Sequence, residues 1–444
     1  MSARAQTGTR PQSPPRAVVL GGYGLVGSAC LRALKSAGFA VTGVGRDPQA
    51  AQRVDPDGDW LIRDIAHATA ADWARDLAGV DVIINASGAL QDGARDNLQA
   101  IHEGAIKALI DGLAGQPLRF IQISAVGADT NAPTAFMATK ARGDAALMAS
   151  PLDWIILRPT LVLGRAAYGG TALLRAAAAT PIVGFRVMPG TPVQTVALDD
   201  LAAAVVQAAK GEIPSRTLAD LTAPDIHSFA SLTDKMRVWL GFAPWRFKPT
   251  VPQPLLTLTG KIADGLGWLG WRSPFRSTAL KVLADGIKGN PTAWLTAGGT
   301  PCRSLDHTLR DMPATLQDRW FSRLFLLLPI AIGTLSLFWL LSGLIGLVRA
   351  PLAIDVLTSR HIGTGPATMA VIGGGIIDIT LGAAILFRRH ARRACGGMIA
   401  VSLGYLAAGT VLTPDIWADP LGPFVKVLPG ITLAAMVMAL LDDR

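Results

Sequence analysis

The C-terminal part of the sequence consists of apolar segments that suit a lipid bilayer. Leu324–Val348 contains no charged residue, and as an α-helix it would be about 37 Å long, enough to cross a hydrocarbon core of roughly 30 Å. Three further apolar stretches follow, Thr368–Phe387, Ala394–Thr413 and Phe424–Leu441. We therefore expect a membrane domain of four spanning helices over residues 324–444.

The charges beside these segments predict how the domain is oriented. Lys and Arg near the ends of spans tend to stay on the cytoplasmic side. Four arginines lie in the predicted loop at 388–393, whereas Asp415 and Asp419 lie between the third and fourth spans. Arg319 and Arg323 precede the first span. The pattern predicts a multi-pass protein of the cell (inner) membrane, with the N-terminal domain and both termini in the cytoplasm.

Composition argues against a nucleic-acid-binding protein and against a metal site. Only 16% of the residues are charged and the net charge is +9, without a basic run between aromatic residues. We therefore expect no nucleic-acid partner, and a surface that faces a membrane explains the positive charge better. The three cysteines, Cys30, Cys302 and Cys395, cannot form a complete disulfide set and lack close metal-ligand spacing, so we expect reduced thiols and no metal. Residues 1–16 form a Pro/Ser/Arg-rich segment that we expect to be a disordered tail.

A glycine-rich turn is the most informative feature of the N-terminal half. It follows the short apolar run Ala17–Leu20 and precedes a helical pattern, and it reads Gly21, Gly22, Tyr23, Gly24, Leu25, Val26, Gly27. Gly21 would make the tight turn, Gly24 would let the backbone approach a pyrophosphate, and Gly27 would let the helix pack closely on the strand. The turn predicts a dinucleotide site, and an ordinary turn between strand and helix is the alternative.

The end of the next predicted strand indicates which dinucleotide is preferred. Phe39–Val44 is followed by Gly45 and Arg46, at the distance from the glycine turn where an acidic residue would bind the ribose hydroxyls of NAD. An arginine suits the 2′-phosphate of NADP instead. We therefore predict NADP, with NADPH preferred over NADH. The alternative is a solvated arginine at the start of a loop.

Further apolar strands follow at the spacing of a repeating strand and helix. They are expected at Trp60–Arg63, Val82–Asn85, Arg119–Ser124 and Trp154–Leu157, with helical segments such as Leu98–Leu113 between them. This alternation predicts an α/β fold, a doubly wound parallel Rossmann sheet over residues 17–222. The cleft should lie beyond the carboxyl ends of the strands.

Several of these strands end in motifs that occur together in one enzyme family. They are Asp64-Ile65, Asn85-Ala86-Ser87-Gly88, Ser124-Ala125-Val126-Gly127-Ala128, Lys140 and Arg158-Pro159-Thr160. With the glycine turn, this set resembles the extended and atypical short-chain dehydrogenase/reductases. The resemblance implies cofactor contacts from Asp64, Ile65, Ala86, Ser87, Gly88, Ser124, Lys140 and Pro159, and catalytic positions for Ser124 and Lys140. A helix cap for Asp64, a turn role for Ser124 and a solvated helix position for Lys140 stay open as alternatives.

One departure from the family pattern concerns the proton donor. In the family, a tyrosine four residues before the lysine passes a proton to the carbonyl oxygen, but here that position is Phe136. A phenyl ring cannot donate a proton. Of the three tyrosines, Tyr23 lies in the glycine turn and Tyr405 in the third predicted span. Tyr168, in a glycine-rich loop, is the candidate catalytic substitute, with a purely structural loop tyrosine as the alternative.

The missing tyrosine moves the resemblance toward the atypical branch, which includes NmrA-like sensors and a Rossmann-type accessory subunit of respiratory complex I. Two functions stay open. One is a membrane-anchored NADP(H)-dependent oxidoreductase acting on a lipophilic carbonyl or quinone-like substrate. The other is a non-catalytic NADP(H)-binding sensor or accessory subunit with a membrane-protein partner.

Residues 223–323 are rich in Trp and Pro, and we expect them to form a substrate-side, membrane-proximal region. Six tryptophans beside Lys and Arg would suit the headgroup layer: Trp239, Trp245, Trp268, Trp271, Trp294 and Trp320. Leu255–Leu269 is predicted to be an amphipathic helix that lies on the bilayer, with a core helix as the alternative.

The apolar C-terminal block also has a family resemblance. The spacing from Gly373-Gly374-Gly375 through Asp378 to Gly382, together with the short four-helix layout, resembles the DoxX-like membrane domains. A carboxylate near the bilayer centre is costly, so Asp378 is expected either at a quinone or proton site or in an interhelical hydrogen bond, with Ser402 or Tyr405 as partner.

Overall fold

The structure is a computed structural model that describes residues 13–90, 92–93, 97–271, 273, 275–420 and 422–441. The chain divides into two compact units. The first comprises residues 1–261 and 274–316 and contains a β-sheet, and the second comprises residues 262–273 and 317–444 and contains the long apolar helices.

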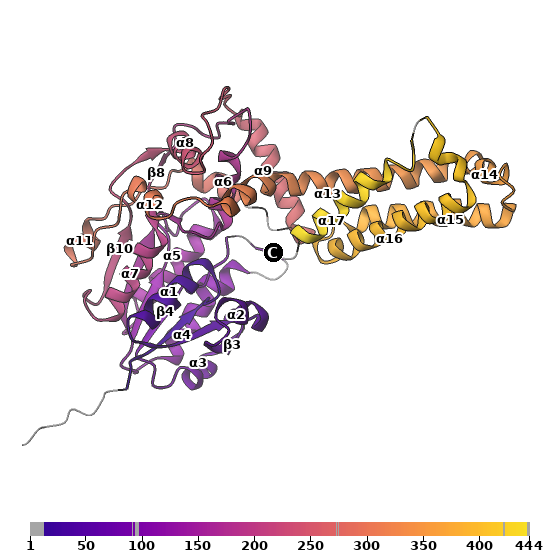
Figure 1. Cartoon of the computed structure of the whole chain (residues 1–444). Helices are drawn as coiled ribbons and strands as arrows, with labels where there is room; N and C mark the ends of the chain where they lie inside the picture. Colours follow the sequence, from indigo (N-terminus) through magenta and orange to yellow (C-terminus); the bar gives the residue numbers. More distant parts are fainter. Residues whose placement is uncertain are drawn as a thin grey trace, which may run out of the picture. The chain divides into compact units, whose positions relative to one another are not determined.

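The first unit is built on a seven-stranded parallel sheet (Figure 1). In spatial order the strands are β10 (Thr217–Leu221), β6 (Asp153–Pro159), β5 (Arg119–Ile123), β4 (Val82–Asn85), β1 (Arg16–Leu20), β2 (Ala40–Gly45) and β3 (Asp59–Ile62). The chain moves outward from β1 to β3 and then returns to β4 on the other side of β1. This confirms the predicted doubly wound sheet, and its switch point lies between β1 and β4, where such folds bind ligands.

Strand register brings the predicted motifs to one edge of this sheet. Leu20, the last residue of β1, is paired with Val44 on one side and with Asn85 on the other. The segments that follow β1, β2 and β4, which begin at Gly21, Arg46 and Ala86, therefore leave the sheet at the same edge.

Both faces of the sheet are covered, so its central strands are apolar on both sides. Ala17 and Val19 pack with α1 (Leu25–Ser36) and α7 (Leu198–Ala209), whereas Val18 and Leu20 pack on the opposite side. The helices there are α3 (Ala70–Asp76), α4 (Ala105–Gly112) and α5 (Ala135–Met148). Because successive strand residues point to opposite faces, a short apolar run supplies both cores.

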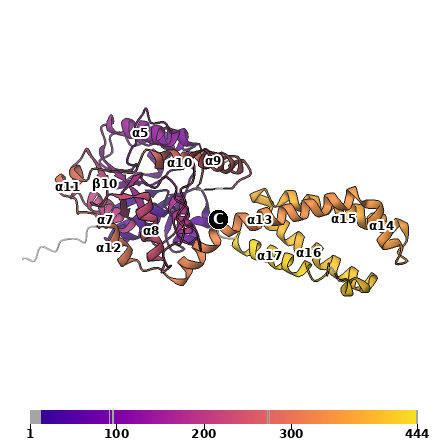
Figure 2. The ribbon, with the colours of Figure 1, turned by 90° about the horizontal axis from the view of Figure 1, so that it is seen from above.

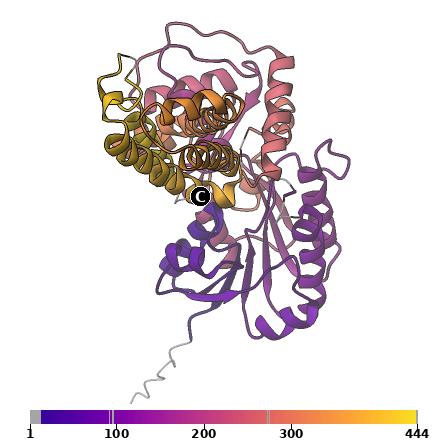
Figure 3. The same ribbon diagram turned by 90° about the vertical axis from the view of Figure 1, so that its right-hand side faces the viewer.

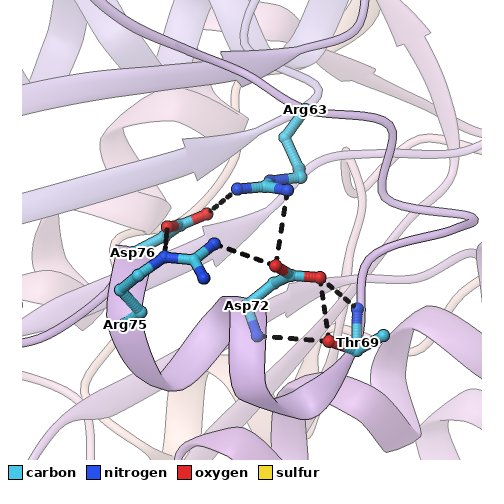
Figure 4. Close-up of polar contacts among 5 residues, drawn as sticks. All are labelled: Arg63, Thr69, Asp72, Arg75 and Asp76. Atoms are coloured by element: carbon cyan, nitrogen blue, oxygen red, sulfur yellow. Dashed lines mark hydrogen bonds and ion pairs between the residues drawn. The ribbon is translucent and has the colours of Figure 1, made fainter.

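A polar network holds the chain where it leaves β3 (Figure 4). At the start of α3, the Thr69 hydroxyl and the Asp72 carboxylate cap each other's backbone N–H groups. Asp72 also accepts a hydrogen bond of 2.8 Å from Arg75 Nη2, and these hydrogen bonds lower the pKa of its carboxyl. Arg63 forms ion pairs with Asp72 and Asp76. The network thereby fixes the residue that immediately precedes Asp64.

A third core of the first unit is shared by α6 (Gly169–Ala178), α8 (Phe229–Trp239) and α12 (Leu305–Asp311). The predicted helix at 98–113 contains a π-helical turn at Ala100–Gly104 before α4 begins. The shorter elements are α2 (Pro48–Val54), β7 (Leu161–Leu163), β8 (Pro192–Val193), β9 (Thr195–Ala197), β11 (His227–Ser228), α10 (Ser277–Ala284) and α11 (Thr292–Thr296). The helix α9 (Gln253–Trp268) extends from the first unit into the second.

The expectation that all six tryptophans suit the headgroup layer is wrong for two of them. Trp245 and Trp294 are buried within the first unit, and their indole N–H groups donate hydrogen bonds of 2.8 Å to the carbonyls of Thr180 and Thr300. Tryptophan suits a headgroup layer and a protein core equally well when its N–H is paired, so composition alone did not separate the two environments.

The second unit contains helices that run side by side (Figures 1 and 2) and are seen nearly end-on in Figure 3. They are α13 (Leu316–Val348), α15 (Thr364–Ala384), α16 (Arg388–Leu412) and α17 (Val427–Leu440), with α14 (Ala350–Thr358) and a 3₁₀ turn at Pro414–Ala418 in the connections. Among the described residues, α13, α15 and α16 are long and apolar enough to cross a membrane.

Two predictions about these helices need correction. The fourth apolar stretch forms a helix of only 14 residues. Such a helix is about 21 Å long, which is shorter than the hydrocarbon core of a bilayer. It is short because residues 423–426, where the helix was expected to begin, form turns. The predicted basic loop at 388–393 is the start of α16, and the connection is only residues 385–387. Arg and Ala have high helix propensity, so the helix begins in this charged segment, before the apolar stretch from which it was predicted.

Asp378 is buried among three helices of the second unit. Its carboxylate accepts hydrogen bonds from the Ser342 hydroxyl of α13, at 3.0 Å, and from the Tyr405 hydroxyl of α16, at 3.2 Å. This confirms the predicted contact with Tyr405, whereas the second partner among the described residues is Ser342 and not Ser402. Gly374 permits the approach, since a Cβ there would lie 2.7 Å from the Tyr405 oxygen.

Candidate functional site

The glycine turn has the geometry of a dinucleotide loop. Gly21 has φ +71°, and a Cβ there would lie 2.8 Å from Ser87 Cα, so neither the conformation nor the space suits another residue. A Cβ at Gly27 would lie 2.2 Å from the Gly21 carbonyl oxygen. Gly24 is the N-cap of α1, whose first N–H groups have no partner within the helix and suit a pyrophosphate.

Tyr23 extends from this turn to the end of β2. Its ring lies against the backbone of Gly45, where a Cβ would be 2.2 Å from the ring, and its hydroxyl accepts a hydrogen bond of 3.3 Å from the Arg46 N–H. Arg46 is therefore held next to the glycine turn, at the end of the site where an adenine-linked ribose binds in this fold.

The two carboxylates near this end have local partners. Asp47 is the N-cap of α2 and accepts hydrogen bonds from the N–H groups of Gln49 and Ala50. Asp64 accepts a hydrogen bond of 3.1 Å from the Ala66 N–H, and its other oxygen lies 3.2 Å from His67 Nδ1. Asp64 thus shapes the turn after β3, and the side chain of the adjacent Ile65 packs toward the core.

A cavity of about 520 Å³ lies at the carboxyl ends of β4, β5 and β6. The predicted site residues that line it are Val26, Ala86, Ser87, Gly88, Ser124, Lys140 and Pro159. Its apolar wall includes Leu90, Val126, Phe136, Met137, Leu161, Val162, Val282 and Ile287, and Asp129 and Asp285 are its carboxylates. A larger, open hollow of about 1080 Å³ at the opposite end of the strands contains none of the predicted site residues.

Lys140 brings a buried ammonium group to this cavity. It lies on α5, and its Nζ donates a hydrogen bond of 3.1 Å to the Ile123 carbonyl and lies 5.9 Å from the centre of the Phe136 ring. Burial lowers the pKa of Lys140, and the nearby Asp144 opposes that shift. The alternative of a solvated lysine is therefore wrong.

Ser124 and Lys140 share a buried partner that the sequence analysis did not identify. The Ser124 hydroxyl donates a hydrogen bond of 2.6 Å to Asp144 Oδ2, and Arg158 Nη2 donates to the same oxygen at 3.2 Å. Asp144 is fully buried. Burial raises the pKa of its carboxyl, opposed by the hydrogen bond from Ser124 and by the charges of Lys140 and Arg158. Because the Ser124 proton points to Asp144, the N–H groups of Lys140 are the better donors toward a ligand.

His102 is a second buried group that sequence reasoning missed. Its Nε2 accepts a hydrogen bond of 3.2 Å from the Ala89 N–H, and its Nδ1 lies 2.9 Å from the Thr139 hydroxyl, which donates to the Ala135 carbonyl. These contacts require the neutral tautomer with the proton on Nδ1. Gly88 lies between this ring and Lys140, since a Cβ there would be 3.3 Å from His102 Nε2 and 3.6 Å from Lys140 Nζ.

The buried histidine predicts a loss of stability in acid. Burial lowers the pKa of His102 from 6.5 to about 2, and the charge of Lys140 adds to that shift. Between these values the unfolded chain binds a proton that the folded chain does not, so the free energy of unfolding should fall by about 1.4 kcal/mol per pH unit below pH 6.5. Thermal unfolding from pH 7.5 to 5 should show this component.

The matched variants for this measurement are His102→Gln and His307→Gln. His102→Gln should remove the component. His307 has an exposed side chain, so its replacement is the control for removing a histidine from the surface. Equal pH dependence in all three proteins would contradict the assignment.

Tyr168 lies apart from these residues. Its side chain is 61% exposed at the residue before α6, and it is not among the residues that line the cavity. Its role as a replacement proton donor therefore stays a prediction.

Comparisons with known proteins agree with this geometry. Residues 21–211 match a family model described as NAD(P)H-binding, and residues 336–435 match the DoxX-like family. No curated protein matches the chain. The chain therefore combines an N-terminal domain that has a Rossmann fold and matches an NAD(P)H-binding family model with a C-terminal domain that matches the DoxX-like family.

Solved structures resemble the N-terminal domain in fold. The enzyme WbmG of Bordetella bronchiseptica in complex with NAD is 15% identical over 70% of this chain and 96% of its own, with a TM-score of 0.53. A putative epimerase from Burkholderia cenocepacia is 17% identical over 70% and 99%, with a TM-score of 0.52. WbmH of B. bronchiseptica in complex with NAD+ is 14% identical over 68% and 97%, with a TM-score of 0.51. At these identities the likeness concerns the fold alone.

Proposed function

We propose that the chain is a membrane-anchored NADP(H)-dependent oxidoreductase that reduces a neutral, lipophilic, quinone-like or carbonyl compound. The observation that carries the proposal is the cavity of about 520 Å³, in which an apolar wall faces the buried ammonium of Lys140 beside the dinucleotide turn. A bound NAD(P)H supplies a hydride at its nicotinamide ring.

The preference for NADP(H) is supported by the two residues after β2. Asp47 is the N-cap of α2, and its Oδ1 accepts hydrogen bonds from two backbone N–H groups, so it has a structural role in starting this helix. Arg46 begins this segment beside Tyr23 and can pair with a 2′-phosphate.

Arg46→Asp should therefore weaken NADPH binding by roughly tenfold or more, because it removes a charge-assisted pair and adds a like charge. NADH affinity should change much less. Fluorescence titration of detergent-solubilised wild type and variant with each nucleotide measures both values, with Arg53→Asp as the control for net charge. Equal losses for the two nucleotides would refute the NADP preference.

The substrate class follows from the charge of the cavity lining. Among the described residues that line the cavity, two carry a negative charge, Asp129 and Asp285, and one carries a positive charge, Lys140. This balance disfavours a ligand that carries a diphosphate, such as a nucleotide sugar, and the apolar wall favours an uncharged hydrocarbon or aromatic body. A membrane domain in the same chain fits a substrate of low water solubility.

Phe136 favours a quinone-like substrate over a simple ketone. Hydride addition to a ketone leaves an alkoxide, which is about as basic as hydroxide ion and so needs a positioned acid. Hydride addition to a quinone leaves a phenolate-type anion, which is about as weakly basic as the tyrosine anion. Lys140 can stabilise that anion by charge, and water can then supply the one proton that completes the hydroquinone.

The experiment that tests the proposal follows NADPH absorbance in purified protein with a short-chain quinone and with a panel of lipophilic ketones. We expect NADPH oxidation with the quinone and much slower oxidation with the ketones. Tight NADPH binding without oxidation of any compound would contradict the proposal.

That result would favour the second candidate, a sensor or accessory subunit that binds NADP(H) without turnover. The specific observation in its favour is again Phe136, which leaves Lys140 without the family's proton donor. A sensor predicts stabilisation of the protein by NADPH and an NADPH-dependent association with a membrane partner.

A further inference from the structure

Helix α9 carries an apolar stripe that the described parts of the protein leave exposed. Leu255, Leu258, Ile262 and Leu266 are 49%, 54%, 55% and 37% exposed. Their spacing of three and four residues places them on one side of the helix. An isolated exposed leucine is ordinary, but four on one helical stripe mark an interaction surface.

This stripe is distinct from the side of α9 that packs within the protein. Leu256 and Ala263 are buried, and a Cβ at Gly260 would lie 3.1 Å from Leu280 Cδ1. Lys261 and Thr257 are exposed on the remaining side. The helix therefore has a buried side, an exposed apolar side and a polar side. The alternative prediction, a helix of the protein core, explains the buried side but not the exposed apolar side.

The end of α9 is fixed to the turn between two long apolar helices. Within the second unit, the Trp271 indole N–H donates a hydrogen bond of 2.6 Å to the Leu386 carbonyl, and the Arg388 N–H donates one of 3.0 Å to the Leu269 carbonyl. Arg388 also lies 5.8 Å from the centre of the Trp271 ring. Residues 385–387 connect α15 to α16, so this turn lies where membrane-crossing helices meet the headgroup layer.

We propose that α9 lies in the headgroup layer of the bilayer that α13, α15 and α16 cross, with Leu258, Ile262 and Leu266 in contact with lipid. The occupant of the stripe is the bilayer because the helix leads directly into a turn at the bilayer surface. The arginines at the start of α16 add positive charge that suits anionic headgroups. The proposal does not depend on the oxidoreductase function.

Lipid contact can be measured in proteoliposomes made from the full chain. Single cysteines at Leu258 and Ile262 would carry an environment-sensitive fluorophore, and the lipid would carry a nitroxide quencher either near the headgroup or near the acyl-chain end. The native cysteines are buried or half-buried, so labelled wild-type protein measures the background. Thr257 and Lys261 on the polar side are the matched control positions, and Leu337, an exposed residue of α13, reports lipid contact within a span.

We expect the headgroup-region nitroxide to quench probes at Leu258 and Ile262 several-fold more strongly than probes at Thr257 and Lys261. The acyl-chain-end nitroxide should quench the Leu337 probe more strongly than either of them. Quenching of the Leu258 and Ile262 probes by aqueous iodide but not by lipid would overturn the proposal. Shielding from both quenchers would also overturn it and would indicate a second copy or a protein partner on the stripe.

Discussion

Phe136→Tyr should increase the rate of lipophilic ketone reduction by about 10²–10⁴-fold, the usual contribution of a positioned general acid. Phe136 lines the cavity one helical turn before Lys140, whose Nζ lies 5.9 Å from the ring centre. A hydroxyl on this ring would lie near that ammonium, which lowers the pKa of a neighbouring phenol. Single-turnover oxidation of bound NADPH, followed by absorbance, measures the gain.

Three comparisons make this prediction specific. Quinone reduction should change only a few-fold, because the phenolate-type anion does not need the acid. Phe136→Leu should show no gain with ketones. Adding Lys140→Met to Phe136→Tyr should remove the gain, since the tyrosine would lose the neighbouring charge. Unchanged ketone reduction in Phe136→Tyr, with NADPH still tightly bound, would mean that the missing tyrosine is not what limits this site.

Asp144→Ala should lower the free energy of unfolding by about 3–5 kcal/mol, the range for removing one partner of a buried ion pair. Asp144 is fully buried and accepts from Ser124 and Arg158. Without its carboxylate, the buried ammonium of Lys140 and the Arg158 guanidinium would lose their counter-charge. Denaturant unfolding of the purified protein, compared with wild type, measures this loss.

Asp306→Ala is the control for this variant. Asp306 pairs with Lys235 at the surface, with 59% of its side chain exposed, so its removal should cost less than about 1 kcal/mol. Asp144→Asn keeps the side-chain volume and should fall between the two. A cost for Asp144→Ala as small as that for Asp306→Ala would show that the buried cluster is not an ion-pair network.

Features that depend on short stretches of chain could be predicted well from the sequence. The strand Val82–Asn85 has the predicted bounds, because a buried strand is a short apolar run between breaks. The glycine turn could be predicted because a side chain at these positions would clash with nearby backbone. A Cβ at Gly27, for example, would lie too close to the Gly21 carbonyl oxygen. The long apolar helices could be predicted for the same reason, although the charges of Arg388–Arg393 concealed where α16 begins.

Features that depend on contacts between distant residues could not be predicted in this way. Asp144 is 20 residues from Ser124 and His102 is 37 residues from Thr139, and no spacing rule relates positions so far apart. The one available signal was the four-residue interval from Phe136 to Lys140 to Asp144, which places all three on one helix face.

By itself, the sequence determined the kinds of structure present: a glycine-rich turn on a parallel sheet, a helix with Phe136 four residues before Lys140, and helices that suit a bilayer. These follow from steric and hydrophobic properties that act within a few neighbouring residues. Only the tertiary structure decided the partners of the buried charges, the burial of Trp245 and Trp294, and the exposure of one stripe of α9. The physical reason is that burial and ion pairing depend on which surfaces meet, and that is set by the whole fold.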